Sequence, residues 1–153
     1  MDNPERRPSI ASSVCYKDPK RALRWLEEAF GFEQSMVILG PNDELMHSEM
    51  RFGDGLVMVA SEWSPKHKSP VSIDGVNTQT VHVQITEDID AHCERARKAG
   101  ATIVMEPTTQ FYGDRTYRAV DPEGHIWSFG QTVKKMTSDE WDGAMGVKTK
   151  TRL

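Results

Sequence analysis

Two stretches of the chain repeat the same order of hydrophobic and polar positions. The first begins with a strand-like run over residues 10–17, which is rich in small and β-branched side chains. Apolar side chains at helical spacing follow, between Asp18, which can cap the free N–H groups of a helix, and Gly31, which favours a helix end. Three short strand patterns complete this stretch, over residues 32–39, 44–52 and 56–61.

The same order returns after residues 62–76, whose prolines, glycines and polar side chains indicate a loop. A strand pattern over residues 78–86 precedes a helix that Asp88 or Thr86 caps and Gly100 stops. Three further strands are predicted over residues 102–106, 115–120 and 126–131.

The repeat predicts an α+β protein of two tandem β-α-β-β-β modules. The capping residues Asp18 and Asp88 lie about 70 residues apart, an offset typical of an internal repeat. A length of 153 residues suits one domain. We expect the modules at about residues 9–61 and 77–131, followed by a polar tail over residues 132–153.

Alternation within two of the strands separates an apolar face from a polar one. The apolar side chains are Val81, Val83 and Ile85 in one strand and Met46, Met50 and Phe52 in the other. The polar side chains are Thr80, His82 and Gln84, and His47, Glu49 and Arg51. Because the apolar side must pack on helices, we expect a curved mixed sheet around a cupped, polar-floored cavity, with the helices on the outer face.

Composition narrows the function classes. A net charge of -4 makes nucleic acid and an anionic membrane surface unexpected partners. No apolar run approaches the ~18 residues of a membrane span, and the charged N-terminus is unlike a secretory signal. Cys15 and Cys93 are few and far apart, which suggests reduced thiols. We therefore expect a cytoplasmic protein whose partner is a small molecule.

Two segments of the second stretch carry a family resemblance. Residues 111–115 and 120–128, the latter containing an Asp-Pro-Glu-Gly turn, resemble the C-terminal half of the vicinal oxygen chelate superfamily, which has the glyoxalase, bleomycin-resistance and extradiol-dioxygenase fold. More narrowly, they are similar to uncharacterised glyoxalase-like proteins related to PhnB, and the likeness spans about residues 9–131. The resemblance implies a homodimer. It leaves the activity open, because the fold carries lyases, isomerases, dioxygenases and drug-sequestering proteins.

The resemblance also implies where a metal would bind. Metal-dependent members carry His, Gln or Glu at one position on the opening strand and one on the closing strand of each module. Counted from the helix caps and the Asp-Pro-Glu-Gly turn, these positions fall near Ala11, Met58, Thr80 and Ser128. None of these side chains is a competent ligand for a divalent ion. We therefore predict no metal and no cofactor, and metal-free binding or sequestration of a small molecule.

Three polar-face residues leave an enzymatic alternative open. His47, Glu49 and His82 could form a two-histidine, one-carboxylate set, which would suit a lyase, isomerase or dioxygenase-type reaction at a non-standard site. Alternatively, they are pocket or surface residues that hydrogen-bond one another. Whether the protein is an enzyme is undecided at this level.

The ligand-contact candidates are mainly aromatic residues near predicted loops and strand ends. Such rings suit planar ligands, although ordinary packing explains them equally well. The predicted ligand-binding residues are Trp63, Gln84, Phe111, Tyr112, Tyr117 and Ser128. Among the remaining polar residues, we expect Asp114 and Arg115 to form an ion pair and His92 to face solvent.

Overall fold

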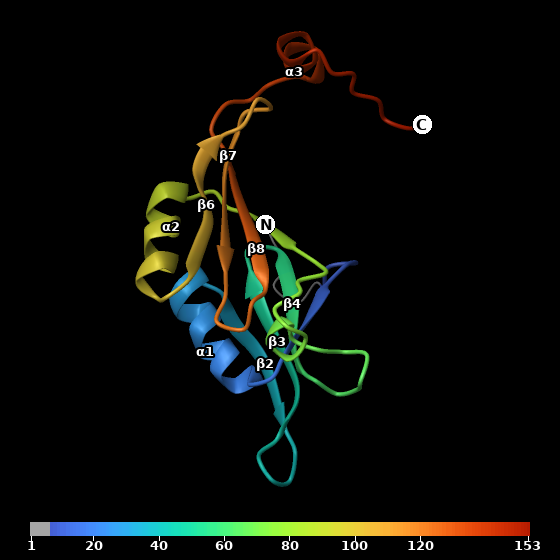
Figure 1. The fold of residues 1–153 in the computed structure, drawn as a ribbon, viewed down its shortest axis with the longest axis vertical. Helices are drawn as coiled ribbons and strands as arrows, with labels where there is room; N and C mark the ends of the chain where they lie inside the picture. Colours follow the sequence, from blue (N-terminus) through green and yellow to red (C-terminus); the bar gives the residue numbers. More distant parts are fainter. Residues whose placement is uncertain (1–6) are drawn as a thin grey trace.

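The computed structural model describes residues 7–153 and contains two successive β-α-β-β-β modules (Figure 1). The first comprises β1 (Ser12–Tyr16), α1 (Pro19–Phe30), β2 (Glu33–Leu39), β3 (Leu45–Phe52) and β4 (Gly55–Ser61). The second comprises β5 (Val81–Gln84), α2 (Ile89–Lys98), β6 (Thr102–Thr109), β7 (Asp114–Val120) and β8 (Ile126–Thr132). A 3-10 helix (Pro70–Ser72) lies between them, and α3 (Ser138–Met145) follows. The predicted α+β class and the repeat are confirmed.

Each module forms a four-stranded mixed sheet, and the two sheets have the same topology. Their strand orders are β1-β4-β3-β2 and β5-β8-β7-β6. The first strand of each module runs parallel to the last strand of that module, and the other neighbours are antiparallel. The strands β2 and β6 therefore form equivalent edges of the two sheets.

Local sequence signals account for the module helices. Asp18 and Asp88 both accept hydrogen bonds from amides in the first turn of their helices, as predicted. Gly31 ends α1 with a φ of 74°, a left-handed conformation that residues with a side chain adopt at a cost. The second helix is capped at Ala99, one residue before Gly100, which was predicted to stop it.

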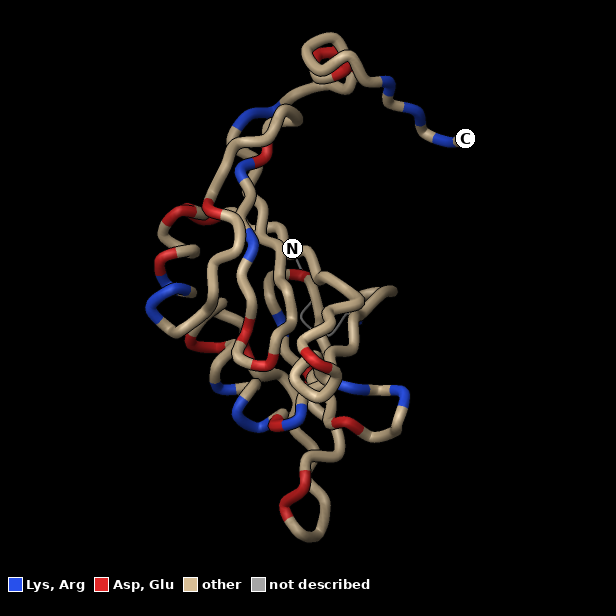
Figure 2. The backbone as a smooth tube through the Cα atoms, viewed as in Figure 1, with Lys and Arg blue, Asp and Glu red and all other residues tan. Residues whose placement is uncertain are grey.

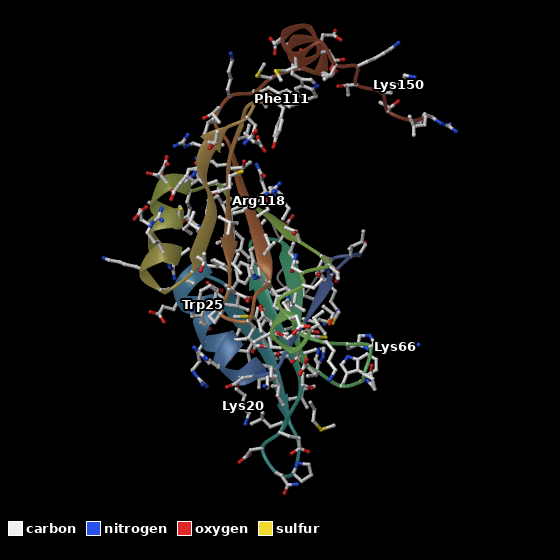
Figure 3. The ribbon with its side chains drawn as sticks, viewed as in Figure 1. Lys20, Trp25, Lys66, Phe111, Arg118 and Lys150 are labelled. Carbon is white, nitrogen blue, oxygen red and sulfur yellow. The ribbon has the colours of Figure 1, made fainter. Side chains whose placement is uncertain are left out.

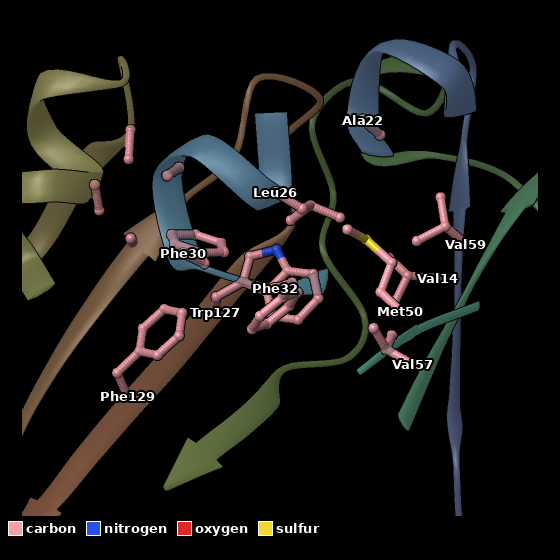
Figure 4. Close-up of a cluster of buried hydrophobic side chains, with 14 of the residues drawn as sticks. Val14, Ala22, Leu26, Phe30, Phe32, Met50, Val57, Val59, Trp127 and Phe129 are labelled. Atoms are coloured by element: carbon pink, nitrogen blue, oxygen red, sulfur yellow. The ribbon is translucent and has the colours of Figure 1, made fainter. Parts of the chain in front are cut away.

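One hydrophobic core joins the two modules (Figure 4). At the end of α1, the Phe30 ring lies 5.6 Å from the Trp127 ring and 4.7 Å from the Phe129 ring of β8. From the first sheet, Met50 and Val59 join the same cluster. The core therefore lies on the side of each sheet that the helices cover. We call the opposite side of each sheet its helix-free face.

The Asp-Pro-Glu-Gly turn between β7 and β8 links the modules. The Asp121 side chain is buried, and its Oδ2 accepts hydrogen bonds from the Tyr16 hydroxyl at 2.6 Å and the Trp127 indole N–H at 3.1 Å. Its Oδ1 accepts from the amides of Glu123 and His125, both at 3.0 Å. Burial and the nearby Asp121 carboxylate raise the pKa of Tyr16 well above its ordinary value, so its hydroxyl remains a donor.

Charge is absent from half of the strands. No Lys, Arg, Asp or Glu occurs in β1, β4, β5 or β8, and these strands are tan in Figure 2. Charged residues lie on the helices, the turns, the C-terminal tail and the other four strands (Figure 2). The charged groups of the two sheets therefore come from β2, β3, β6 and β7.

Three details differ from the predicted pattern. The fifth strand is confined to Val81–Gln84 because its pairing with β8 covers only these residues. The sixth strand reaches Thr109, and its pairing with β7 shifts register beside Pro107, which has no N–H to donate. Met46 is 66% exposed and belongs to the β2–β3 hairpin, which extends past the N-terminal end of α1 (Figure 1).

The C-terminal segment projects away from the sheets (Figure 1). Its helix, α3, begins with a capping box in which Thr137 and Glu140 bond each other's backbone amides. Within residues 7–153, no helix has both the length and the apolar content needed to cross a membrane.

Candidate functional site

The helix-free face of the first sheet holds one nearly buried carboxylate. Glu49 alternates with the core residue Met50 on β3, and its side chain is only 4% exposed. Its paired neighbours on the same face are Met36 on β2 and Met58 on β4. An ionised carboxylate between apolar neighbours is unfavourable unless a cation or several hydrogen bonds compensate it.

Arg7 and His47 provide this compensation. The two Nη atoms of Arg7 donate to Glu49 Oε1 at 2.6 Å and Oε2 at 3.1 Å. His47 Nε2 lies 3.0 Å from the same Oε1. The hydrogen bond from Arg7, and after it that from His47, lowers the pKa of Glu49 to about 2. Glu49 is therefore ionised throughout the physiological pH range.

Three predicted residues form a hydrogen-bonded row on the helix-free face of the second sheet. His82 Nδ1 lies 3.0 Å from Ser128 Oγ, and His82 Nε2 lies 3.1 Å from Gln84 Oε1. Gln84 Nε2 donates to Asp114 Oδ2 at 3.3 Å and to Thr132 Oγ1 at 3.1 Å. We call Ser128, His82 and Gln84 the polar row. It presents both donors and acceptors on a face that no helix covers.

Gly130 provides the space in which the polar row lies. A Cβ atom at this position would be 3.0 Å from Gln84 Oε1 and 3.0 Å from His82 Cε1. Most Cβ contacts in proteins are longer, so a side chain here would displace both residues. The absence of a side chain at Gly130 is therefore what lets the row lie over β8.

Arg118 adds a positive charge to the same face, although it was not among the predicted site residues. It is exposed on β7 and pairs with Ser128 across the sheet (Figure 3). Side chains on β7 alternate between the two faces, and Tyr117 and Ala119 are buried on the helix side. This alternation would have placed Arg118 on the helix-free face. Arginine is a common partner of anionic groups.

Two predicted aromatic residues lie at the end of the polar row. Phe111 and Tyr112 occupy the tip of the β6–β7 hairpin, with ring centroids 5.2 Å apart and nearly perpendicular planes. Together with Trp141 of α3 they line an open cavity of about 530 Å³. Asp114 and Thr132, which accept hydrogen bonds from Gln84 Nε2, also line this cavity. These two residues therefore contact both the polar row and the aromatic cavity.

The other two predicted aromatic residues lie elsewhere. Trp63 is exposed in the loop after β4, where its ring stacks on His67 at 3.8 Å. Tyr117 is fully buried, and its ring stacks on Phe129 in the core. The prediction that Tyr117 contacts a ligand was wrong, because the alternation of β7 directs this side chain toward α2.

His92 was expected to face solvent but is buried. Its Nε2 lies 2.9 Å from the Phe30 carbonyl oxygen, and its Nδ1 lies 2.6 Å from the Tyr117 hydroxyl. Burial lowers the pKa of His92, so the neutral ring bridges the two modules as a donor to Phe30 and an acceptor from Tyr117.

The expected ion pair between Asp114 and Arg115 is absent. Arg115 Nη2 instead lies 2.8 Å from Asp90 Oδ1 of α2, and Asp114 accepts from Gln84. Adjacent residues of a strand point to opposite faces, so Arg115 is directed to the helix side and Asp114 to the polar row.

A second cavity, of about 250 Å³, lies between the modules. Ser13 and Cys15 of β1, His67 of the intermodule loop and His125 are among its lining residues. His125 Nε2 lies 2.7 Å from the Cys15 carbonyl oxygen. Burial raises the pKa of the Cys15 thiol, which makes the sulfur a poor nucleophile at neutral pH.

The chelate positions implied by the resemblance do not carry a set of metal ligands. On the parallel strands, Met58 pairs with Ser13 and Ser128 pairs with His82. The neighbour of Ser128 is therefore His82 rather than Thr80. A single histidine among these positions does not fit the ligand set of a divalent ion.

The alternative set also fails to assemble. His47 contacts Glu49 on the first sheet, whereas His82 belongs to the polar row of the second. Over the part of the chain that the structure describes, no three or more His, Cys, Asp or Glu side chains are placed to hold a metal ion. The prediction of one site from His47, Glu49 and His82 was therefore wrong for a single chain.

Known proteins resemble this chain in sequence over most of its length. The family model described as Glyoxalase/Bleomycin resistance protein/Dioxygenase superfamily matches residues 9–129. An uncharacterised protein of Mycobacterium bovis is 32% identical over 142 residues, which are 90% of this chain and 92% of that protein. An uncharacterised protein of Mycobacterium tuberculosis is equally similar, with 82% of its length covered.

Solved structures show the same fold. TioX from Micromonospora sp. ML1 is 29% identical with a TM-score of 0.66, over 80% of this chain and 97% of that one. TnmS3, an antibiotic binding protein from Streptomyces sp. CB03234, is 22% identical with a TM-score of 0.60, over 80% and 93% of the two chains. The duplicated modules and the match over residues 9–129 show that this chain belongs to the glyoxalase/bleomycin resistance protein/dioxygenase superfamily.

Proposed function

We propose that the protein binds a planar small molecule on the helix-free face of its second module, without a metal ion. The observation that carries this proposal is the polar row, which lies over Gly130 and is hydrogen-bonded through Gln84 to two residues of the cavity that Phe111 and Tyr112 line. Aromatic side chains beside a few placed donors and acceptors are typical of ligand sites. The fold shared with TnmS3, an antibiotic binding protein, supports the binding of a small molecule.

The proposal is tested by thermal unfolding of the wild-type protein with a panel of planar antibiotics and natural products. A ligand that binds only the folded state stabilises it by about 2.7 kcal/mol at a concentration of 100 times its Kd. At least one planar compound is expected to raise the Tm. If no compound in the panel raises it, the protein is not a binder of this class.

Gly130→Val is expected to weaken binding of that compound by about tenfold, because the new side chain displaces His82 and Gln84. Titration calorimetry of the variant measures the loss. Gly143→Val is the matched control, since a Cβ at Gly143 in α3 meets nothing within 4 Å. Equal affinities for the two variants would place the ligand away from the polar row.

The metal-free part of the proposal rests on the side chains at the chelate positions. In the strand pairing, these positions correspond to Ser13, Met58, His82 and Ser128, of which only His82 carries an imidazole or carboxylate group. Metal analysis of the purified protein, with thermal unfolding after addition of Zn²⁺, Mn²⁺ or Ni²⁺, tests it. A stoichiometric metal, or stabilisation by one of these ions, would contradict it.

We also propose that the protein forms a homodimer through its β2 edge. Four successive apolar residues of this strand are each at least 40% exposed: Met36, Val37, Ile38 and Leu39. An exposed apolar edge strand promotes association, and a second copy covers it without requiring another protein.

Val37→Lys is expected to convert the dimer to a monomer, because a charge would lie in the apolar contact. Sedimentation velocity at micromolar protein measures the change. Val71→Lys, at a 53% exposed position in the 3-10 helix, is the control and should remain dimeric. A wild-type monomer at these concentrations, or a dimer insensitive to Val37→Lys, would contradict the proposed contact.

A further inference from the structure

The first module contains an ion pair whose two members differ sharply in how they are held. The Glu49 side chain is 4% exposed and lies on the central part of β3. The Arg7 side chain is 57% exposed and lies five residues before β1. Residues 7–10 make no backbone hydrogen bond to the rest of the described chain. The Glu49 carboxylate is therefore held by the sheet, whereas Arg7 lies on a segment whose described link to the sheet is this ion pair.

The surroundings of Glu49 favour one type of partner. The carboxylate lies between Met36 and Met58 on the same face, and His47 contacts one of its oxygens. Both oxygens accept from Arg7 in a two-point arrangement, which is the geometry that a planar guanidinium provides. The methionines offer apolar, polarisable contacts to the carbon skeleton of a ligand. A carboxylate in such a place remains costly whenever its cation leaves.

The exposure of Arg7 suggests that another cation can replace it beside Glu49. The Arg7 side chain is more than half exposed, so breaking the pair costs little in lost packing. Another cation could take its place and satisfy the same two oxygens. The bound segment would then lower the apparent affinity for that cation by the fraction of molecules in which Arg7 occupies the site.

We infer that Glu49 and His47 form a recognition site for the guanidinium or amine group of a small molecule, and that Arg7 occupies this site as a competing internal cation until the ligand displaces it. This inference rests on the proposed small-molecule function and specifies the charge of a ligand group at the first module. The Glu49 site is negatively charged, whereas the polar row of the second module lies beside the positively charged Arg118.

The test uses benzylguanidine and its neutral analogue benzylurea with the full-length protein. Arg7→Ala is expected to tighten benzylguanidine binding about tenfold, because the internal competitor is removed. Benzylurea affinity should not change. Arg24→Ala is the matched control, since Arg24 is exposed on the helix side and the substitution alters the net charge equally. In this control, benzylguanidine should bind as it does to the wild type.

Glu49→Gln in the Arg7→Ala background is expected to abolish the gained affinity. Because Arg7→Ala leaves the Glu49 carboxylate with His47 as its partner, this variant is expected to be less stable than the wild type. Binding is therefore measured at a temperature at which circular dichroism shows every variant to be folded. In Arg7→Ala, the carboxyl ¹³C signal of Glu49 provides a second readout and should shift on addition of benzylguanidine. Unchanged affinity in Arg7→Ala, or a gain that persists in Arg7→Ala/Glu49→Gln, would overturn the inference.

The outcomes also separate this inference from the proposed function. If planar compounds bind in a Gly130-dependent way while benzylguanidine binding ignores Arg7 and Glu49, the cation site is wrong and the proposed function stands. If neither the planar compounds nor benzylguanidine bind any variant, both are wrong.

Discussion

Replacing Asp121 with alanine is expected to lower the free energy of unfolding by about 3–5 kcal/mol, because one buried carboxylate satisfies four donors. Without it, the Tyr16 hydroxyl and the Trp127 N–H would be left unpaired in the core. Urea denaturation measured by circular dichroism gives the difference directly.

The control for this prediction is Asp54→Ala, which removes an exposed carboxylate from the turn between β3 and β4 and should change stability by less than about 0.5 kcal/mol. A double-mutant cycle with Tyr16→Phe and Asp121→Asn isolates the bond that joins β1 to the second module. A loss below about 1 kcal/mol in Asp121→Ala would show that the turn is not a major link between the modules.

Phe30→Ala is the second large effect, with an expected loss of about 3–5 kcal/mol from transfer and cavity terms. The ring is fully buried and lies against Trp127 and Phe129 of the other module. It also packs within 6.3 Å of the His92 ring, which links the Phe30 carbonyl to Tyr117. The substitution therefore weakens the core at the place where the modules meet.

Differential scanning calorimetry and urea denaturation check this prediction. Phe111→Ala is the matched control: its ring is 43% exposed at the hairpin tip, and we expect a change within about 0.5 kcal/mol. We expect one cooperative transition in both variants. A small loss in Phe30→Ala, or two separate transitions in the wild type, would mean that the modules are stabilised independently.

The two helix-free faces present different chemistry to a ligand. The first sheet offers a nearly buried carboxylate between methionines, and the second offers the polar row beside an exposed arginine. Both sets of groups lie on strands whose opposite sides pack into the shared core. A ligand could therefore bind without repacking the core, and the stability changes expected for Asp121 and Phe30 should be separable from the binding changes expected for Gly130 and Arg7.

Features that depend on short-range physical chemistry were predictable from the residues. The capping aspartates, the αL glycine after α1 and the two-residue alternation of β3 and β5 act within a few residues of each other. They correctly indicated the duplicated modules. They also indicated the polar faces on which His47, Glu49, His82 and Gln84 lie.

The wrong predictions concern residues whose partners lie on other elements of the fold. Tyr117 and His92 are polar-tipped side chains, and sequence alone could not show that each would satisfy the other's hydrogen bond inside the core. Arg115 pairs with Asp90 of α2 instead of its neighbour, because only the packing of helix on sheet brings these residues together.

The class of fold, the order of its elements and the polar side of its strands could be predicted from the residues, since these follow from spacing along the chain. Which polar residues meet depends on how the distant segments pack. Arg7 and Glu49 are 42 positions apart, and Tyr16 and Asp121 are 105 apart. Such pairs form because hydrophobic burial brings distant segments together, and the polar groups carried there must find partners away from water.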